Sequence, residues 1–381
     1  MSFEEINKKV LNIVTTLKKH DFEAYFVGGC VRDLIMKRDI HDIDIATSAT
    51  PEDVMKLFKR TIPVGTQFGV VLVVDGDDQF EVATFRSDGR YIDGRHPESV
   101  TFSSPEEDAK RRDFTINGLY WDPIAKKVID FIEGEADIEK KQIRAIGDPL
   151  KRFEEDKLRM LRAVRFSARF DFPIESKTRG AIEKLKDKIH EVSAERIRDE
   201  LVKMLTDAHP ATAMRLLDDV GLLHEILPEI TAMKGVEQPP EFHPEGDVFV
   251  HTMLLLEKLH NADKVLALGA LFHDVGKPPT QTFEDRIRFN AHEHVGAEMT
   301  KKVMRRLKFS NKDIDDVVVC VKNHMVFGQV QKMREGKLKN MIARETFDVE
   351  LEMHRIDCES SHGILDNYHF LQKKREALRR K

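Results

Sequence analysis

The stretch AYFVGGCVRDLIMKRDIHDIDIAT, residues 24–47, decides the fold. Its apolar start, Ala24–Val27, predicts a strand that breaks at Gly28-Gly29 before a helix over about 31–37, and a second strand is predicted over 43–46. A glycine turn between strand and helix suits a phosphate, because the backbone can approach an anion closely and the helix start offers free N–H groups. An ordinary tight turn has the same pattern, so the pattern alone leaves both readings open.

Asp42 and Asp44 lie two residues apart at the start of the second predicted strand, so their side chains share one face. Two carboxylates on one face are costly unless cations neutralise them, and hard oxygen ligands suit Mg²⁺. Glu81, in the apolar strand over 80–85, is the candidate for a further carboxylate of a two-metal site. The alternatives are an exposed acidic turn for the aspartates and a solvent-facing position for Glu81.

The rest of the first 140 residues predicts an α+β fold with a mixed or antiparallel sheet. An amphipathic helix is predicted over 3–19, and a β-hairpin is predicted from the apolar run 68–74 through the turn Asp75-Gly76-Asp77-Asp78. Residues 84–102, with DGRY at 88–91 and DGRHP at 93–97, predict a mobile loop. Almost everything from Pro149 onward predicts helix.

Composition limits the class of protein. The chain has 381 residues with a net charge of −5, which suits two or three domains and gives no general sign of nucleic-acid binding. It shows no signal peptide and no apolar run long enough to cross a membrane, so no membrane partner is expected. Its three cysteines are scattered, which favours a reducing cytoplasm. Boundaries are predicted near residue 140 and within 236–247.

Four ordered motifs carry a resemblance to a known family. They are VGGCVRD at 27–33, DID at 42–44, RRDFTING at 111–118 and FEEDKLRMLRAVRF at 153–166. Together they resemble the class II tRNA nucleotidyltransferases and bacterial poly(A) polymerases, members of the polymerase β-like nucleotidyltransferase superfamily. The resemblance covers about residues 20–230, and one small departure is Gly118, where the family more often has alanine.

The resemblance implies a nucleotidyltransferase head with a small mixed or antiparallel sheet (1–140), an all-α neck that binds the nucleotide base and RNA (141–235), and an all-α body (236–381). Asp42 and Asp44 would hold catalytic Mg²⁺ with the assistance of Glu81. The residues implied to bind the nucleotide are Gly28, Gly29, Arg32, Arg112, Asn117, Asp156, Arg159, Arg162 and Arg165.

In the neck, Asp156 and Arg159 are three residues apart on a predicted helix and would be neighbours on one face. An aspartate accepts from the exocyclic amine of cytosine or adenine, and an arginine donates to the ring nitrogen. Uracil and guanine present a carbonyl to the aspartate, so this pair would select CTP and ATP. The alternative is an intrahelical salt bridge of Arg159 with Asp156 or Glu155.

The last third carries an ordered set of histidines and aspartates around His273-Asp274 that resembles the HD superfamily of metal-dependent phosphohydrolases. Such ligands suit a transition metal such as Mn²⁺ or Ni²⁺. The candidate ligands are His251, His273, Asp274, His292, His324 and Asp357, with His243 and His294 as lesser candidates. The alternative is a retained fold whose incomplete site only contacts tRNA.

The expected function is addition of CCA, or of the terminal A, to the 3′ acceptor end of tRNA, with ATP and CTP as substrates. The predicted loop at 84–102 argues against CC-only addition, because CC-only members lack it. The alternatives are a poly(A) polymerase and an HD phosphohydrolase whose head serves to bind RNA. The sequence leaves the oligomeric state open.

Overall fold

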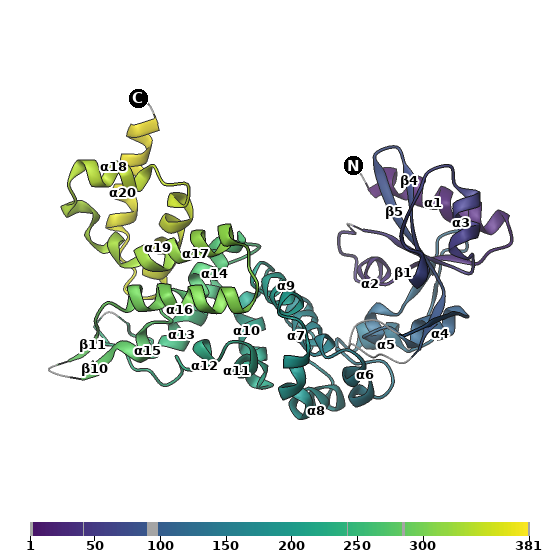
Figure 1. Ribbon diagram of the computed structural model, residues 1–381, viewed down its shortest axis with the longest axis horizontal. Helices are drawn as coiled ribbons and strands as arrows, with labels where there is room; N and C mark the ends of the chain where they lie inside the picture. The colour runs from purple at the N-terminus through teal and green to yellow at the C-terminus, as the bar shows by residue number, and fades with distance from the viewer. Residues whose placement is uncertain (1–2, 41, 90–97, 242, 284–285, 380–381) are drawn as a thin grey trace. The chain divides into compact units, whose positions relative to one another are not determined.

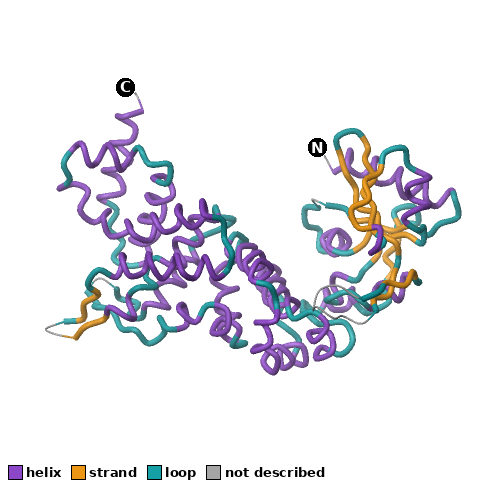
Figure 2. The backbone as a smooth tube through the Cα atoms, viewed as in Figure 1, coloured by secondary structure: helices purple, strands orange, loops and turns teal. Residues whose placement is uncertain are grey.

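The computed structural model describes residues 3–40, 42–89, 98–241, 243–283 and 286–379. The chain forms two compact units. The head unit contains residues 1–159 and 171–185, and the body unit contains residues 160–170 and 186–381. Strands are concentrated in the head unit, whereas the described part of the body unit is helical apart from one small hairpin (Figure 2).

The head unit is built on a seven-stranded mixed sheet with the order β3-β4-β5-β2-β1-β8-β9. Only β2 and β5 run parallel, and the other neighbours are antiparallel. The α+β prediction with a mixed sheet is therefore confirmed. The strands are β1 (Ala24–Val27), β2 (Asp44–Thr47), β3 (Thr61–Gly65), β4 (Val70–Asp75), β5 (Asp78–Thr84), β8 (Tyr120–Asp122) and β9 (Lys127–Ile129).

One face of this sheet is covered by helices, because alternate residues of β1, β2 and β5 present apolar side chains to that face. Phe26, Ile45 and Val82 point into a core that the apolar face of α1 completes. On the opposite face a smaller cluster around Ala46 and Tyr120 is buried. The helices of the head unit (Figure 1) are α1 (Phe3–Lys19), α2 (Gly29–Ile35), α3 (Pro51–Leu57), α4 (Pro105–Lys110), α5 (Gly134–Glu139), α6 (Pro149–Glu155) and α8 (Ser176–Leu185).

Several predicted elements have the expected places. The predicted hairpin turn joins β4 to β5, with Asp75 opposite Asp78 and Gly76 at a φ of +68°. Helix α3 begins after Thr50, whose side chain forms a reciprocal capping box with Asp53. The local signals of turn and cap residues were therefore sufficient for these elements.

Three short hairpins were not predicted. The β8–β9 hairpin completes the sheet after Trp121, and β6 (Arg86–Asp88) pairs with β7 (Val100–Phe102) at the base of the predicted loop. The body unit, predicted to be all-α, contains β10 (Gln281–Phe283) and β11 (Ile287–Phe289). Strands of three residues are too short for an alternating pattern to stand out. The tip of the predicted loop, residues 90–97, lies outside the described residues.

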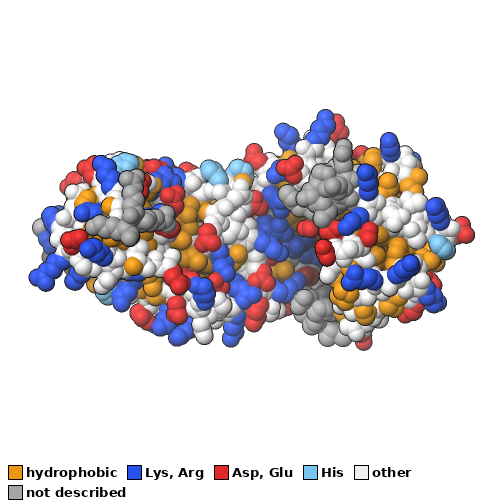
Figure 3. Space-filling model, turned by 90° about the horizontal axis from the view of Figure 1, so that it is seen from above, with side chains coloured by type: hydrophobic (Ala, Val, Ile, Leu, Met, Phe, Trp, Pro, Cys, Tyr) orange, Lys and Arg blue, Asp and Glu red, His pale blue; other side chains and the backbone are white. Residues whose placement is uncertain are grey.

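The body unit is otherwise helical, as expected. On the face seen in Figure 3, basic and acidic side chains of the body unit are interspersed. Among the described residues, no helix combines the length and apolar character needed to cross a membrane. Helix α7 (Leu158–Phe170) leads into α9 (Ala194–Leu205), α10 (Pro210–Asp219), α11 (Leu222–Ile226), α12 (Pro228–Thr231), α13 (Val248–Glu257), α14 (Lys264–Phe272), α15 (Lys277–Thr280), α16 (His292–Arg306), α17 (Asn311–Asn323), α18 (Glu335–Ile342), α19 (Phe347–Ser360) and α20 (Asp366–Arg379).

A buried carboxylate fixes α4 against the sheet. Asp108 is 1% exposed and accepts hydrogen bonds from the Tyr120 hydroxyl at 2.6 Å and from Arg112 Nη2 at 2.9 Å. Arg111 Nε donates to the other oxygen at 2.9 Å. Burial raises the pKa of Asp108, but the two arginines outweigh burial and hold it at about 2.

We expect Asp108→Asn to destabilise the head unit by about 3 kcal/mol at pH 7, because it leaves two arginines without their buried counter-charge. Urea unfolding followed by the fluorescence of Trp121, the single tryptophan, reports on this unit. The exposed Glu106→Gln on the same helix is the control and should change stability little. The difference should shrink as the pH falls from about 4 towards 2, because the wild-type carboxylate then becomes protonated. An unchanged unfolding midpoint at pH 7 would contradict this role.

Candidate functional site

Asp44 and Glu81 lie side by side on the two parallel strands. The ladder pairs Ile45 with Val82 and Ala46 with Ala83, so Asp44 and Glu81 occupy the next matching position. Both line a cavity of about 190 Å³. Their side chains share the sheet face opposite to the helical core, because Ile45 and Val82 point into that core.

Electrostatics shows that this pair of carboxylates carries a cost. Both side chains are exposed at the mouth of this cavity, but partial desolvation there raises the pKa of both groups, and Asp44 raises the pKa of Glu81 further. Asp42 also raises the pKa of Asp44, which places it close by, and Arg112 opposes these shifts at both carboxylates. Asp42 is exposed and precedes β2, while Ile43 between the aspartates is buried. The predicted alternation of the DID motif is present.

The glycine bend adjoins these carboxylates. Val27 pairs directly with Asp44 across β1 and β2, and Gly28 follows at a φ of +80°. A side chain at Gly28 would be strained in this left-handed conformation, and its Cβ would lie 3.5 Å from Arg112 Nη1. At Gly29 an added Cβ would lie 3.5 Å from Arg32 Nη2. The bend therefore brings the backbone between two guanidinium groups.

Arg32 is held in one orientation at this bend. It is 5% exposed, and its Nη1 donates to Asn117 Oδ1 at 2.6 Å. Its Nε donates to Asp33 Oδ1 at 2.9 Å, and Asn117 is itself fixed because its amide donates to Asp113 Oδ1 at 3.2 Å. Arg112 is fixed by Asp108 as described above. Two guanidinium groups beside three carboxylates can bind the phosphates of a nucleotide while the carboxylates hold divalent cations.

The donor set of the head fits Mg²⁺. Asp42, Asp44 and Glu81 offer only carboxylate oxygens, the hard ligands that Mg²⁺ prefers. Desolvation and the neighbouring carboxylate raise the pKa values of Asp44 and Glu81, and bound cations would favour their ionised forms. These residues are brought together as the sequence predicted, although their roles as ligands stay predictions.

In the neck, Asp156 differs from the prediction because it does not share a helix with Arg159. Helix α6 ends at Glu155, and Asp156 is extended, with its Oδ1 accepting from the Leu158 backbone N–H at 3.0 Å as a cap of α7. Arg159 lies in the first turn of α7, and its Nη1 donates to Glu155 Oε2 at 2.8 Å. Arg159 Nη2 also donates to the backbone carbonyl of Arg111 at 3.3 Å. The Glu155–Arg159 ion pair considered from the sequence is thus present.

Arg162 and Arg165 lie further along α7, in the body unit, and both face Glu200 of α9. Arg165 Nε donates to Glu200 Oε2 at 2.6 Å, and Arg162 Nη1 lies 3.9 Å from Oε1. Burial raises the pKa of Glu200, but Arg165 and Arg162 outweigh it and lower the pKa. These arginines therefore join two helices, whatever further contacts they make with a nucleotide.

The second group of candidates, His251, His273, Asp274, His292, His324 and Asp357, comes together as one cluster, here called the histidine–aspartate cluster. Asp274 is its centre, because Oδ2 lies 3.2 Å from His273 Nε2 and 3.9 Å from His251 Nε2. Its Oδ1 lies 3.4 Å from His292 Nε2 and 3.7 Å from His324 Nε2. His251 Nε2 also contacts Asp357 Oδ1 at 3.0 Å.

The cluster fits a transition metal. Nε2 of His273 is buried and makes no hydrogen bond to any described residue. Burial lowers the pKa of His324 to about 4, so its ring is neutral near pH 7, which is the form that binds metals. Burial also lowers the pKa of His251, but Asp357 and Glu245 outweigh it and raise the value to about 9. His251 is therefore protonated near pH 7, and its charge balances Asp357 and Glu245 in the way that a bound metal ion would.

A cavity of about 500 Å³ opens beside the cluster, with cationic side chains in its wall. Lys277, Arg286 and Arg288 line it together with Phe289 of β11. Lys277 is 5% exposed, and its Nζ lies 2.7 Å from Asp274 Oδ2. The arrangement suits an anionic substrate with an aromatic portion.

The two lesser histidine candidates differ in their surroundings. His243 lines the cavity, and its Nδ1 contacts Glu245 Oε1 at 3.0 Å. The exposed His294 side chain contacts the neighbouring Glu293, with Nδ1 at 3.0 Å from Oε1. His294 therefore lies outside the cluster.

Sequence reasoning missed three residues that hold the candidates in place. Asp108 could have been predicted, because it lies four residues before Arg112 in a helix whose start is indicated by the cap residue Ser104 and by Pro105. Glu245 and Lys277 had weaker signals. Glu245 lies within 236–247, which was interpreted as a domain boundary. Lys277 lies three residues after Asp274.

Three family models match this chain in order. The poly A polymerase head domain matches residues 24–144, and the probable RNA and SrmB-binding site of polymerase A matches residues 171–234. The HD domain matches residues 247–351. The third match covers every member of the histidine–aspartate cluster except Asp357.

Curated relatives and a solved structure agree with these matches. The CCA-adding enzyme of Oceanobacillus iheyensis is 41% identical over 290 residues, which are 75% of this chain and 68% of that enzyme. The CCA-adding enzyme of Lactobacillus helveticus is 44% identical over 60% of this chain, but the match spans only 57% of that enzyme. The crystal structure of the Bacillus stearothermophilus CCA-adding enzyme in complex with CTP has a TM-score of 0.75 and 30% identity, covering 98% of this chain and 82% of that one. With the head and the histidine–aspartate cluster in the same order along one chain, this protein belongs to the family of CCA-adding enzymes.

Proposed function

We propose that this chain adds CCA, or the terminal A alone, to the 3′ end of tRNA, with CTP and ATP as substrates. The observation that carries the proposal is the placement of Asp44 and Glu81 on neighbouring parallel strands beside the Gly28 bend. The arginines on both sides of that bend supply the charge that a triphosphate needs. The names of the relatives, and the CTP in the solved structure with 30% identity, support the choice of substrates.

In the proposed reaction the 3′-hydroxyl oxygen of the RNA attacks the α-phosphorus of the nucleotide. A new phosphodiester bond forms, and the bond to the pyrophosphate leaving group breaks. Arg32 and Arg112 orient the phosphates, and their positions are set by Asn117 and Asp108 before a nucleotide arrives. Mg²⁺ bound by Asp42, Asp44 and Glu81 would supply the charge that lowers the pKa of the hydroxyl and neutralises pyrophosphate.

We propose that Asp156 and Arg159 read the nucleotide base. Asp156 accepts from the amine that cytosine and adenine share, and Arg159 donates to the adjacent ring nitrogen. Glu155 holds the Arg159 guanidinium at 2.8 Å, so little side-chain entropy is lost when the base binds. UTP and GTP would place a carbonyl against the Asp156 carboxylate and be rejected.

The functions divide along the chain in this proposal. Residues 1–140 perform the transfer, and residues 141–235 bind the base and the RNA. Residues 236–381 contact the body of the tRNA and carry a second, metal-dependent site. Arg162 and Arg165 would add nucleotide contacts from α7 while keeping their ion pairs with Glu200.

The histidine–aspartate cluster favours a second activity, the hydrolysis of a phosphate ester. The observation that favours it is the cluster itself, with four imidazoles and two carboxylates opening onto a cavity lined by Lys277, Arg286 and Arg288. Mixed nitrogen and oxygen ligands suit Mn²⁺ or Ni²⁺ better than Mg²⁺. The cationic wall would hold the phosphate.

The test of the main activity uses three tRNA substrates, lacking CCA, lacking CA and lacking only the final A, each with labelled CTP and ATP. Gel analysis should show products that stop when the CCA end is complete. A-only addition predicts growth of the third substrate alone. Long tails made from ATP alone would instead identify a poly(A) polymerase.

We expect Asp42→Asn and Asp44→Asn to lower nucleotide addition by at least about a thousandfold, because each removes a charge that holds the divalent cations. Asp77→Asn, on the exposed hairpin turn of the same unit, is the matched control and should keep full activity. Trp121 fluorescence verifies that each variant is folded. Full addition by the Asp44 variant would refute the head assignment.

We expect His273→Ala to remove high-affinity Mn²⁺ or Ni²⁺ binding while leaving nucleotide addition within about twofold of the wild type, because the imidazole is one of the few metal donors. Equilibrium dialysis of the full chain measures the metal, and the tRNA gel measures addition. The exposed His294→Ala serves as the control. Equal metal binding by the two variants would exclude the cluster as the metal site.

A further inference from the structure

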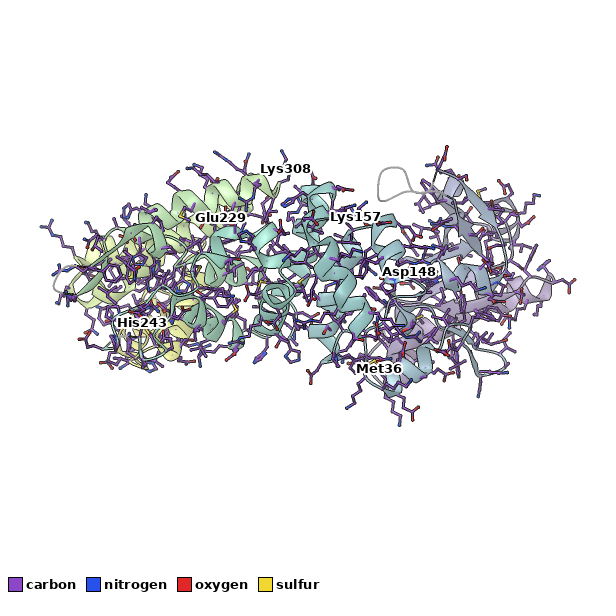
Figure 4. All side chains as sticks on the ribbon, turned by 90° about the horizontal axis from the view of Figure 1, so that it is seen from below. Met36, Asp148, Lys157, Glu229, His243 and Lys308 are labelled. Atoms are coloured by element: carbon purple, nitrogen blue, oxygen red, sulfur yellow. The ribbon has the colours of Figure 1, made fainter. Side chains whose placement is uncertain are left out.

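A loop that the sequence indicated as a boundary forms part of the wall of the histidine–aspartate cluster. Residues 236–247, here called the 236–247 loop, close on themselves through a bridge between Glu237 and Asp247. The Gln238 backbone N–H donates to the Gly246 carbonyl at 2.9 Å. Within the described part of this loop, His243 and Glu245 reach the cluster, and His243 is labelled among the body helices in Figure 4.

Three histidines of the cluster are oriented by the main chain. The Nδ1 atoms of His273, His292 and His324 lie 2.9, 3.0 and 2.7 Å from the carbonyl oxygens of the residues three positions earlier. With Nδ1–H donating to a carbonyl, the lone pair is on Nε2, which faces Asp274. His273 and His324 follow the last residues of α14 and α17, where helix carbonyls are free, whereas His292 begins α16 and uses the carbonyl of Phe289 in β11.

His251 has a different partner. It lies inside α13, where main-chain carbonyls are engaged in the helix. Its Nδ1 lies 2.6 Å from Glu245 Oε1 in a charge contact without the alignment of a hydrogen bond, and its Nε2 forms a hydrogen bond with Asp357 Oδ1 at 3.0 Å. The His251 side chain is fully buried, and the Glu245 side chain is 6% exposed. Both sides of this ring therefore face a carboxylate.

The Glu245 carboxylate is itself fixed. The same Oε1 contacts His243 Nδ1 at 3.0 Å, and the His243 ring stands edge-on to His251 with centroids 4.8 Å apart. The other oxygen, Oε2, is buried and makes no hydrogen bond to a described residue. A buried carboxylate with so few partners contributes mainly through its charge on the neighbouring imidazole.

We propose that Glu245 is a positioning residue for the metal site of the body unit, which holds the Nδ1 side of His251 so that Nε2 faces the metal. It replaces, for His251, the carbonyl that orients each of the other three rings, and it adds a negative charge that makes the ring a stronger donor. The proposal rests on the proposed metal site, and it assigns to the 236–247 loop a part in that site.

The test compares Glu245→Gln with Glu241→Gln, the same change at an exposed position of the same loop. Each full-length protein is freed of metal and titrated with Co²⁺ alone by calorimetry. We expect Glu245→Gln to weaken Co²⁺ binding at least about tenfold and Glu241→Gln to leave it within twofold. Glu245→Asp retains the charge and should fall between Glu245→Gln and the wild type. The metal-free Glu245→Gln protein should melt below the wild type, because the protonated His251 loses one of its two carboxylate partners, so the titrations are run at a temperature where every variant is folded.

The visible spectrum of bound Co²⁺ distinguishes a positioning residue from a ligand. Unchanged bands with weaker binding in Glu245→Gln support the proposal, because the ligand set is then the same. Changed bands would overturn it by making Glu245 a direct ligand, and equal affinity in wild type and Glu245→Gln would overturn it as well. Absence of Co²⁺ binding by the wild type would refute the metal site itself. If Glu245→Gln does not fold, Glu245→Asp and Glu245→Ala are measured instead. The proposal is wrong if both of these variants bind Co²⁺ as tightly as the wild type.

Discussion

The head depends on one electrostatic constraint, the close approach of Asp44 and Glu81 on parallel strands. Their position in the ladder is set by the pairing of Ile45 with Val82, which the core requires. The register that brings Ile45 beside Val82 on the core face also brings Asp44 beside Glu81 on the opposite face. Two adjacent carboxylates repel each other unless positive charge is nearby. Arg112 provides part of that charge and lowers the pKa of both groups. The charge that Arg112 leaves unbalanced is the reason for the proposal that divalent cations bind at this face.

This need for positive charge explains why Arg112 has a buried partner of its own. Asp108 holds the Arg112 guanidinium and is itself held by the Tyr120 hydroxyl, so the charge of Arg112 stays beside the bend at Gly28. Without this partner the Arg112 side chain could extend into solvent, away from the carboxylates. Binding a phosphate would then cost the conformational entropy of that side chain. The ion pair that fixes α4 against the sheet is thus the same one that would position Arg112 for the proposed phosphate binding.

The sequence predicted those parts of the structure that rest on local pattern. Gly28 and the alternation from Asp42 to Ile45 placed the bend and the carboxylates correctly, because a strand allows only one arrangement of neighbouring side chains. It failed where a side chain competed with the helix, since Asp156 caps α7 instead of continuing α6. Glu245 could not be predicted, because its contact with His251 depends on how a loop without periodicity folds back.

The two candidate centres solve the same problem by different means. In the head, carboxylates stand on strands whose spacing fixes them, so orientation comes from the ladder and charge balance from arginines such as Arg112. In the body unit, the imidazoles stand on separate helices, and each ring can rotate unless its Nδ1 is held. The ends of α14, α17 and β11 supply carbonyls for this purpose, but His251 inside α13 requires an acceptor from elsewhere. A loop carboxylate at this position therefore follows from the way helices expose their polar groups, and it makes the 236–247 loop part of the chemistry of the body unit rather than only a connection.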